Sequence, residues 1–317
     1  MKYINLGKNG PLISTIGFGA WGISGRDWGT TDDKKSKRAI HEALDNGVNF
    51  IDTADTYGFG HSEELIAGVL DERGRKDEVI IATKAGNNFY PYLGKEYDST
   101  PANPDYSKKH LIFAAEQSLK RLKVDALDIL QLHSPSIELL ENDEPWEALQ
   151  ILKDQGKIKL AGLSVQSFKE TEHASLLDKH HDILDVLQVR YNMLEREAEK
   201  VLFPKAMEYG TGIIVRIPIL FGLLAGKFTR ESRFGDNDHR RINLSTEKLD
   251  KYLTQLEAIN PFFETHKEYT MAQLALGFTI SHPACSVAIP GGKTPEQVIE
   301  NIAASDIDIP FEDYRQV

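Results

Sequence analysis

Four polar residues of different chemistry stand at or just beyond the ends of three apolar runs. Asp52 and Tyr57 lie in NFIDTADTYG (49–58), Lys84 ends VIIATK (79–84) and His133 ends LDILQLH (127–133). The phenol of Tyr57 could give a proton to a carbonyl oxygen, but a free phenol has a pKa of about 10. A neighbouring Lys84 ammonium would lower that pKa, and Asp52 would hold the ammonium in place. His133 could donate a hydrogen bond to the same oxygen, so the set predicts acid catalysis at a carbonyl without a metal ion.

Each of these residues has a structural interpretation when it is taken alone. Asp52 could cap a turn, Tyr57 could be a packing aromatic, and His133 could cap the turn after its strand. A lysine that closes an apolar strand is expected to point inward, where an unpaired ammonium is costly. Lys84 therefore needs a carboxylate partner, and Asp52 can supply it. Asp55 in the same motif is interpreted as a turn residue.

Composition limits the class of protein. The 317 residues are 41% hydrophobic and 27% charged, which is typical of a globular chain able to bury a large core. The net charge, 37 basic minus 48 acidic residues, is −11, which argues against nucleic acid or an acidic membrane as a partner. The single cysteine, Cys285, fits a reducing compartment, and no signal core or membrane-spanning run is evident. A cytoplasmic protein is expected.

Strand and helix patterns alternate along the chain. Strands are predicted near 15–21, 49–54, 79–84, 127–133, 158–165, 185–192, 212–218 and 286–290. Helices are predicted over 33–46, 62–70, 107–122, 145–155, 167–177, 198–209, 270–282 and 294–303.

Eight alternating units with continuously apolar strands favour a closed (β/α)8 barrel over an open, doubly wound sheet. The segment GFGAWG (17–22) lacks the spacing of a dinucleotide-binding glycine fingerprint, which agrees with that choice. Residues 2–14 are expected to form a hairpin ahead of the first strand, and one domain is expected over 1–317. Two long connections, 85–106 and about 219–247, would lie on the C-terminal face and carry function.

With these residues described, the chain resembles the aldo-keto reductases, and in particular their bacterial sugar- and inositol-dehydrogenase-like branch. The resemblance runs from end to end, through GFGAWGISGRDWG (17–29), FIDTADTYGFGHSEELIAGVL (50–70), ATKAG (82–86), LQLH (130–133), GLS (162–164), QVRYN (188–192), PILFGLLAGK (218–227) and IPGGKTPEQVIEN (289–301). It implies hydride transfer between NAD(P)H and a carbonyl or alcohol such as an aldehyde, ketone, sugar or polyol. Tyr57 would then be the general acid or base, assisted by Lys84, Asp52 and His133.

The resemblance also implies an extended cofactor across the C-terminal rim. Ser164 and Gln188 would bond the nicotinamide carboxamide, and the segment 219–227 would wrap the pyrophosphate. A cation at Lys293 favours NADP(H), with NAD(H) as the alternative. The expected cofactor residues are Trp21, Ser164, Gln188, Arg216, Pro218, Gly222, Leu224, Gly226, Lys227, Gly291, Lys293, Gln297 and Asn301.

Two positions depart from the family pattern. Val165 stands where many relatives carry an asparagine that bonds the carboxamide. Arg216 lies near an aromatic residue of many relatives that stacks on the nicotinamide, so it either contacts the ring or substrate or forms a salt bridge with a nearby carboxylate.

Substrate and assembly stay open at this stage. Aromatic residues at the rim, namely Trp28, Tyr90 and Tyr92, are expected to line the substrate pocket. The competing function is a cofactor-binding regulatory or sensor subunit of the same fold with little turnover, as in the potassium-channel β subunits. A metal-dependent barrel hydrolase is a weaker alternative, because no H-x-H motif ends a strand. Neither the physiological substrate nor the oligomeric state follows from the sequence.

Overall fold

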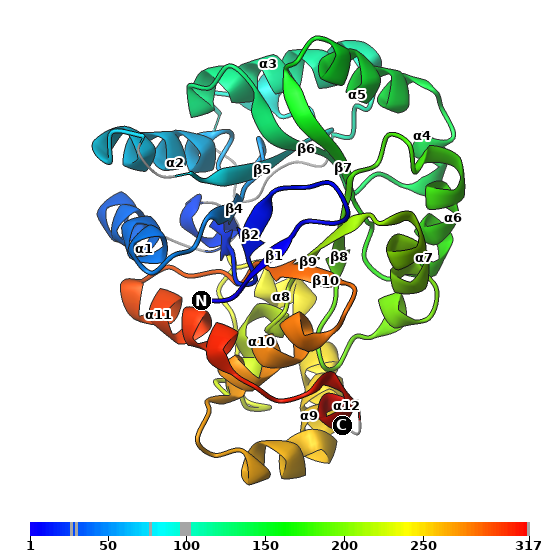
Figure 1. Ribbon diagram of the computed structural model, residues 1–317. Helices are drawn as coiled ribbons and strands as arrows, with labels where there is room; N and C mark the ends of the chain where they lie inside the picture. The colour runs from blue at the N-terminus through cyan, green and yellow to red at the C-terminus, as the bar shows by residue number, and fades with distance from the viewer. Residues whose placement is uncertain (26–27, 29–30, 76–77, 96–102, 316–317) are drawn as a thin grey trace.

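Parallel strands form the centre of the molecule. The computed structural model describes residues 1–317 except 26–27, 29–30, 76–77, 96–102 and 316–317. Its larger sheet has eight strands that pair in chain order, and Figure 1 shows them in the middle with helices around them. The strands are β3 (Phe18–Gly19), β4 (Phe50–Asp52), β5 (Ile80–Ala85), β6 (Leu127–His133), β7 (Ile158–Ser164), β8 (Val186–Arg190), β9 (Gly212–Arg216) and β10 (Cys285–Ala288).

The first and last strands of this sheet also meet, so the barrel is closed. Parallel bridges join Ile16 to Ala288 and Gly19 to Gly291. The Gly17 amide donates to the Ala288 carbonyl at 2.8 Å, and the Ala288 amide donates to the Thr15 carbonyl at 3.0 Å. The prediction of a (β/α)8 barrel is confirmed, and the open sheet is excluded.

The helices that cover the barrel match the predicted segments to within a few residues. Local caps fix several of their starts: the Asp32 carboxylate accepts from the amides of Lys34 and Lys35, and Thr270 forms a capping box with Gln273. These helices are α1 (Asp33–Asp45), α2 (His61–Glu72), α3 (Lys108–Leu122), α5 (Glu144–Asp154), α6 (Glu170–His180), α7 (Leu202–Tyr209), α10 (Met271–Ser281) and α11 (Pro295–Ala303).

The predicted helix over 167–177 begins three residues later than expected. The backbone of Phe168 has a φ of 62°, a left-handed conformation that cannot continue a helix, and α6 starts at Glu170.

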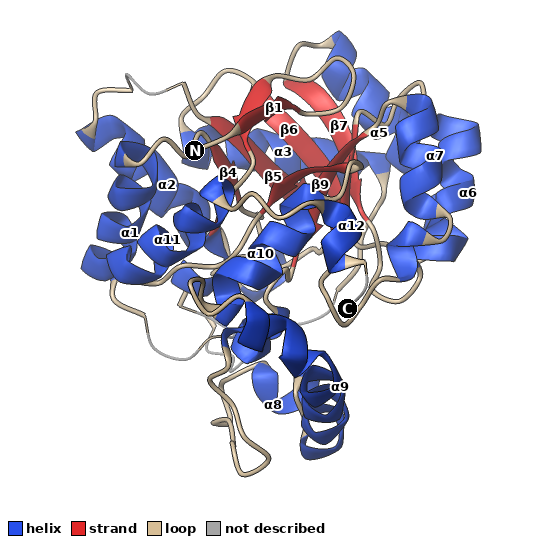
Figure 2. Ribbon diagram, turned by 60° about the horizontal axis from the view of Figure 1, so that its bottom comes forward, coloured by secondary structure: helices blue, strands red, loops and turns tan. Residues whose placement is uncertain are grey.

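Helices outside the alternation were not predicted. They are α4 (Ile137–Leu140), α8 (Arg240–Asn243), α9 (Thr246–Thr265) and α12 (Phe311–Tyr314). The longest, α9, contains Pro261 and buries only Leu249, Leu253, Leu256 and Phe263, so its apolar pattern is weak. In Figure 2, α8 and α9 extend below the barrel, at the end away from β1.

An antiparallel hairpin covers the N-terminal end of the barrel, as predicted (Figure 1). Its strands are β1 (Tyr3–Asn5) and β2 (Leu12–Ser14). Leu6 and Ile13 from this hairpin region pack inside the barrel with Phe50 and Ile129. This end of the barrel is filled by apolar side chains. The polar groups lie at the opposite end, where the parallel strands finish. None of the helices in the described residues is both long and apolar enough to cross a membrane.

Candidate active site

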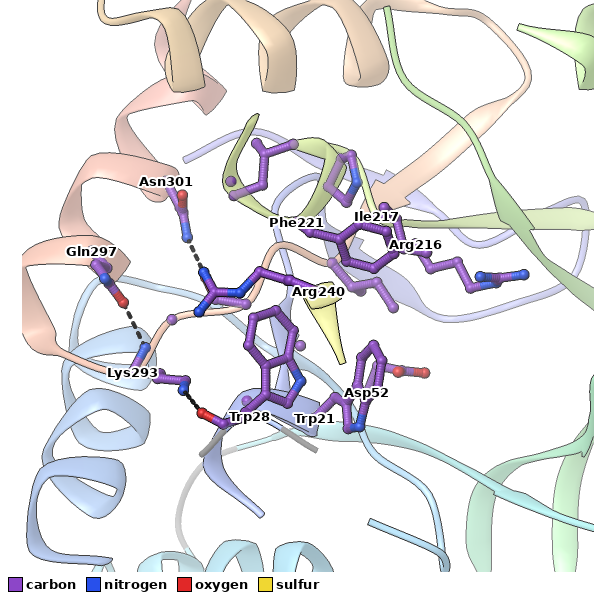
Figure 3. A pocket seen from close by; sticks show the side chains of 18 of the residues that line it. Trp21, Trp28, Asp52, Arg216, Ile217, Phe221, Arg240, Lys293, Gln297 and Asn301 are labelled. Carbon is purple, nitrogen blue, oxygen red and sulfur yellow. Dashed lines mark hydrogen bonds between the residues drawn. The ribbon is translucent and has the colours of Figure 1, made fainter. Parts of the chain in front are cut away.

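A cavity of about 600 Å³ opens at the C-terminal ends of the strands. Side chains from strand ends form one part of it, and other parts come from the connections after β3 and β9 and from the start of α11 (Figure 3). Of the residues singled out from the sequence, the following line it: Trp21, Trp28, Asp52, Tyr57, His133, Ser164, Gln188, Arg216, Pro218, Gly222, Lys227, Gly291, Lys293, Gln297 and Asn301.

Asp52 and Lys84 form a buried ion pair behind the cavity floor. Asp52 ends β4 and Lys84 lies one residue before the end of β5, so the strand register brings their side chains together. Lys84 Nζ donates to Asp52 Oδ1 and to the Thr53 carbonyl, both at 2.7 Å, and lies 3.4 Å from the Tyr57 hydroxyl. Its side chain is fully buried. The predicted carboxylate partner of Lys84 is therefore present, although Lys84 itself does not line the cavity.

The ion pair is held as a charged unit. Gln188 Nε2 donates to the second oxygen of Asp52 at 2.6 Å, so both carboxylate oxygens have a donor. Burial opposes the charge of Lys84, but the charges of Asp52 and Tyr57 outweigh it and raise the pKa of the ammonium. Burial raises the pKa of Asp52 against the opposing charge of Lys84.

Tyr57 reaches the cavity from a tight turn after β4. The Tyr57 amide donates to the Ala54 carbonyl at 3.1 Å. Gly58 follows with a φ of 63°, and a Cβ there would lie 2.4 Å from the Ser24 carbonyl oxygen, so this turn requires glycine. Burial raises the pKa of the Tyr57 phenol, and the Lys84 charge offsets only part of that effect. The effect of Lys84 has the direction that the sequence predicted, but burial outweighs it, so the net pKa of the phenol is raised.

His133 faces Tyr57 across the cavity as a neutral imidazole. The two ring centroids are 5.9 Å apart at an interplanar angle of 77°. Burial, with the charges of Lys84 and Arg216, lowers the pKa of His133 to about 3. A neutral imidazole keeps one N–H, so His133 can donate a hydrogen bond but cannot act as an imidazolium acid near pH 7. Its backbone carbonyl accepts from the Tyr106 hydroxyl at 2.6 Å, which fixes this end of β6.

Amide-binding groups gather at the ends of β7 and β8. Ser164 and Gln188 are where the sequence predicted them, and the Nε2 bond of Gln188 to Asp52 leaves its side-chain carbonyl as the group that could bind an amide. Ser134 is an addition that the sequence analysis missed, although it directly follows His133. Its φ is 55°, and its hydroxyl lies 3.2 Å from that of Ser164. Val165 is fully buried and does not line the cavity.

The connection after β9 exposes backbone to the cavity. A 3-10 segment, η4 (Leu220–Ala225), contains left-handed residues at Phe221 and Gly222, with φ of 57° and 96°. Consecutive residues of this kind turn their amides toward one side, which suits a phosphate. A Cβ on Gly222 would have its nearest neighbour, a ring carbon of Phe228, at 3.7 Å, so the space beside it is open. Leu224 is fully buried, and neither Leu224 nor Gly226 is among the lining residues, so any contact of these two residues with a cofactor stays a prediction.

The other end of the cavity carries two cations (Figure 3). Lys293 Nζ donates to the Trp28 carbonyl at 2.9 Å, and its backbone amide donates to Gln297 Oε1 at 2.8 Å. Arg240, which the sequence analysis missed, is bound to Asp238 and lies 5.4 Å from the Trp28 ring centroid. Arg240 comes from the long connection after β9, and no local pattern indicated that it would lie here.

Aromatic rings border the cavity, but not all those expected. Trp21 and Trp28 pack edge to face at 5.3 Å, and His239 lies 4.2 Å from Trp28. Tyr90 and Tyr92 are not among the lining residues of the described cavity, so their assignment to the substrate pocket stays a prediction. Tyr90 instead stacks on Phe89 at 4.4 Å and contacts Phe113, within the first long connection and beside α3.

Within the described residues, Arg216 has no salt-bridge partner, although a salt bridge was one of its two interpretations. Its Nη2 donates to the Val165 carbonyl at 3.0 Å and to the Ser167 hydroxyl at 2.9 Å. The guanidinium thus spans from the end of β9 to the residues after β7, and part of the side chain lines the cavity.

The described residues hold no cluster of histidine, cysteine and acidic side chains suited to a metal ion. The donor set of the cavity instead fits an extended ligand with an amide at one end and anionic groups farther along. A nicotinamide dinucleotide has this order of groups: the Ser164 and Gln188 side chains would hold its amide, and the η4 backbone its pyrophosphate.

Comparison with known proteins agrees with this geometry. The sequence profile named Aldo/keto reductase family matches residues 15–317. The chain is 31% identical to Aldo-keto reductase YhdN of Bacillus subtilis over 300 residues, 94% of this chain and 87% of that protein. It is also 31% identical to a probable voltage-gated potassium channel subunit beta of Arabidopsis thaliana over 317 residues, 97% of this chain and 92% of the relative.

A solved structure is similar over the same extent. Aldo-keto reductase AKR11C1 from Bacillus halodurans, in its holo form, superimposes with a TM-score of 0.77 at 28% identity, covering 100% of this chain and 94% of that one. The closed barrel, the buried ion pair beside a phenol and the end-to-end profile match together show that this chain belongs to the aldo/keto reductase family of oxidoreductases.

Proposed function

We propose that this protein transfers a hydride between a nicotinamide cofactor and the carbonyl or alcohol carbon of an aldehyde, ketone, sugar or polyol. The observation that carries the proposal is the Lys84 ammonium, 2.7 Å from Asp52 and 3.4 Å from the Tyr57 hydroxyl, beneath a cavity that Tyr57 and His133 both line. The nicotinamide would supply the hydride in the reducing direction.

In this proposal Tyr57 gives a proton to the carbonyl oxygen as negative charge develops there. The raised pKa keeps the phenol protonated at neutral pH, and Lys84 stabilises the phenolate that forms. His133 donates its single N–H to the same oxygen and so orients the carbonyl. In the oxidising direction the phenolate would accept the proton of the alcohol.

Replacing Tyr57 by phenylalanine tests this assignment. We expect Tyr57→Phe to lower kcat by about 10²- to 10⁴-fold, because the general acid is lost, while the dissociation constant of the cofactor changes little. Tyr209→Phe at the end of α7, which removes a hydroxyl bound to Asp178 of α6, is the matched control. Near-normal turnover by Tyr57→Phe would remove Tyr57 from this role.

NADP(H) is proposed as the favoured cofactor. Lys293 and Arg240 place two cations at the cavity end away from Tyr57, where the 2′-phosphate that distinguishes NADPH from NADH would add negative charge. We expect fluorescence titration to show tighter binding of NADPH. Lys293→Met and Arg240→Met should each weaken NADPH binding by about tenfold, the effect of one charged hydrogen bond, and change NADH binding less. If the wild-type protein bound NADPH and NADH with equal affinity, that result would contradict the proposed preference for NADP(H).

A second candidate is a cofactor-binding regulatory subunit, which the potassium-channel β relative favours. The two functions differ in turnover. A screen of sugars, inositols, aldoses and dicarbonyls, read by the absorbance of reduced nicotinamide, should give steady turnover for an enzyme and a single-turnover burst for a sensor. The single buried cysteine is consistent with a cytoplasmic location for either function.

A further inference from the structure

Three strands of the barrel, β5, β8 and β9, carry a cation at or next to their C-terminal end, and two of these three cations are in ion pairs. Lys84 is paired with Asp52. Arg190 binds Glu195 through Nε and Nη2, both at 2.6 Å, and this pair is also buried. Arg216, in register with Arg190 on the neighbouring strand, has no ion-pair partner among the described carboxylates.

Neutral acceptors anchor only one side of the Arg216 guanidinium. Nη2 is taken by the Val165 carbonyl and the Ser167 hydroxyl, and Nε is buried without a partner in the described part of the chain. Burial and the charge of Arg190 lower the pKa of Arg216 to about 10, so the group is still a cation at neutral pH. A partly buried cation without a counter-ion is less favourable than a paired one, so an anionic ligand group beside Arg216 would be stabilising.

Glu170 is the described carboxylate whose charge acts most strongly on Arg216, but no ion pair joins the two. Its Oε1 accepts from the Phe168 amide at 3.2 Å, whereas its Oε2 is buried without a partner in the described residues. Burial raises the pKa of this carboxyl. The positive charge of Arg216 therefore remains available to a ligand.

The direction of the side chain identifies which part of a ligand it could meet. In Figure 3, Arg216 runs from β9 away from Lys293, Arg240 and Asn301, which mark the end proposed for the adenosine phosphate. Its charge acts on Tyr57 and His133 instead. An anion beside Arg216 would thus belong to the molecule whose carbonyl lies between those two side chains.

We propose that Arg216 is a specificity-determining residue that binds a carboxylate or phosphate group on the carbonyl substrate. The inference rests on the proposed reductase function. A guanidinium presents planar donors that match both anions, and the anchors at Val165 and Ser167 fix its orientation before substrate binds. The favoured substrates are then carbonyl compounds with an anionic group close to the reacting carbon.

Matched substrate pairs test this proposal. Succinic semialdehyde is compared with its methyl ester, and glyceraldehyde 3-phosphate with glyceraldehyde, each by kcat/KM with saturating cofactor. The measured quantity is the anionic-to-neutral ratio within one variant, which cancels any change in folded fraction or cofactor affinity. The succinic semialdehyde pair tests for recognition of a carboxylate, and the glyceraldehyde 3-phosphate pair tests for recognition of a phosphate.

In the wild type, the anionic-to-neutral ratio of kcat/KM is expected to exceed about 10 in at least one pair. In Arg216→Met this ratio should fall by about 10- to 100-fold, as the loss of a charged hydrogen bond predicts. Arg216→Lys should keep part of it, and Ser167→Ala, which removes one anchor, should lower it moderately. Arg240→Met, a charge loss at the other end of the cavity, is the control and should leave the ratio unchanged.

Two results would overturn the inference while leaving the reductase function intact: a wild-type ratio at or below one in both pairs, or an unchanged ratio in Arg216→Met. If no member of either pair and no compound of the wider screen is turned over, the reductase function and this inference fail together.

Discussion

The buried Asp52–Lys84 pair makes a quantitative prediction about stability. In Asp52→Asn, Lys84 loses its carboxylate partner and keeps neutral acceptors, namely the new amide oxygen, the Thr53 carbonyl and the Tyr57 hydroxyl, while it has no exposed surface. Breaking such a pair from one side typically costs about 3–5 kcal/mol. Lys84 could instead lose its proton, which sets an upper limit on this cost. Neutralising a lysine requires about 1.4 kcal/mol for each pH unit below its ordinary pKa, which is about 4.6 kcal/mol at pH 7.

The loss of stability in Asp52→Asn should depend on pH in a defined direction. In the wild type the folded-state pKa of Lys84 is raised above its ordinary value. The ion pair therefore stabilises the fold fully below the ordinary lysine pKa, and this stabilisation is lost as the pH rises through the raised pKa. In Asp52→Asn we expect a neutral Lys84 in the folded state and a protonated one in the unfolded chain. The free energy of unfolding of the variant should then increase with pH, and the gap to wild type should narrow by about 1.4 kcal/mol per pH unit between pH 7 and 10.

Equilibrium urea unfolding at several pH values measures this gap, and coincident tryptophan fluorescence and circular dichroism show that one transition is followed. Asp52→Asn combined with Lys84→Met should lose the pH-dependent part, because no buried lysine remains. Asp71→Asn, at an exposed pair with Lys123, is the control and should show no such slope. A small, pH-independent gap for Asp52→Asn would refute a buried ammonium at Lys84.

Two further outcomes are expected. Because the pKa of Tyr57 is raised, kcat/KM for carbonyl reduction should stay level from neutral pH upward and fall only as pH passes that raised value. It should show no acid limb near pH 6, since His133 stays neutral down to about pH 3; a limb near pH 6 would contradict the neutral imidazole. Gly86→Ala should lower the unfolding temperature strongly, because φ is 127° and a Cβ would lie 2.2 Å from the Tyr106 ring, whereas Gly235→Ala, with no described atom within 4 Å and no left-handed φ, should have a much smaller effect. Equal shifts in the two glycine variants would contradict this packing argument.

The sequence alone determined the barrel and the residues at its strand ends. Period-two and period-3.6 apolar patterns are local properties, and the carboxyl ends of parallel strands must share one face, so Asp52, Lys84 and His133 could be placed together from their positions in the runs. The weakly patterned α9 was missed because few of its side chains are buried.

Only the tertiary structure decided the environment of those residues and the course of the long connections. Burial is a sum over distant segments, so the sequence could predict that Lys84 acts on Tyr57 but not that burial outweighs it. The path of a connection depends on contacts that no local pattern encodes. For that reason Arg240 reaches the cavity while Tyr90 turns away from it, and Arg216 binds backbone and hydroxyl groups rather than a carboxylate.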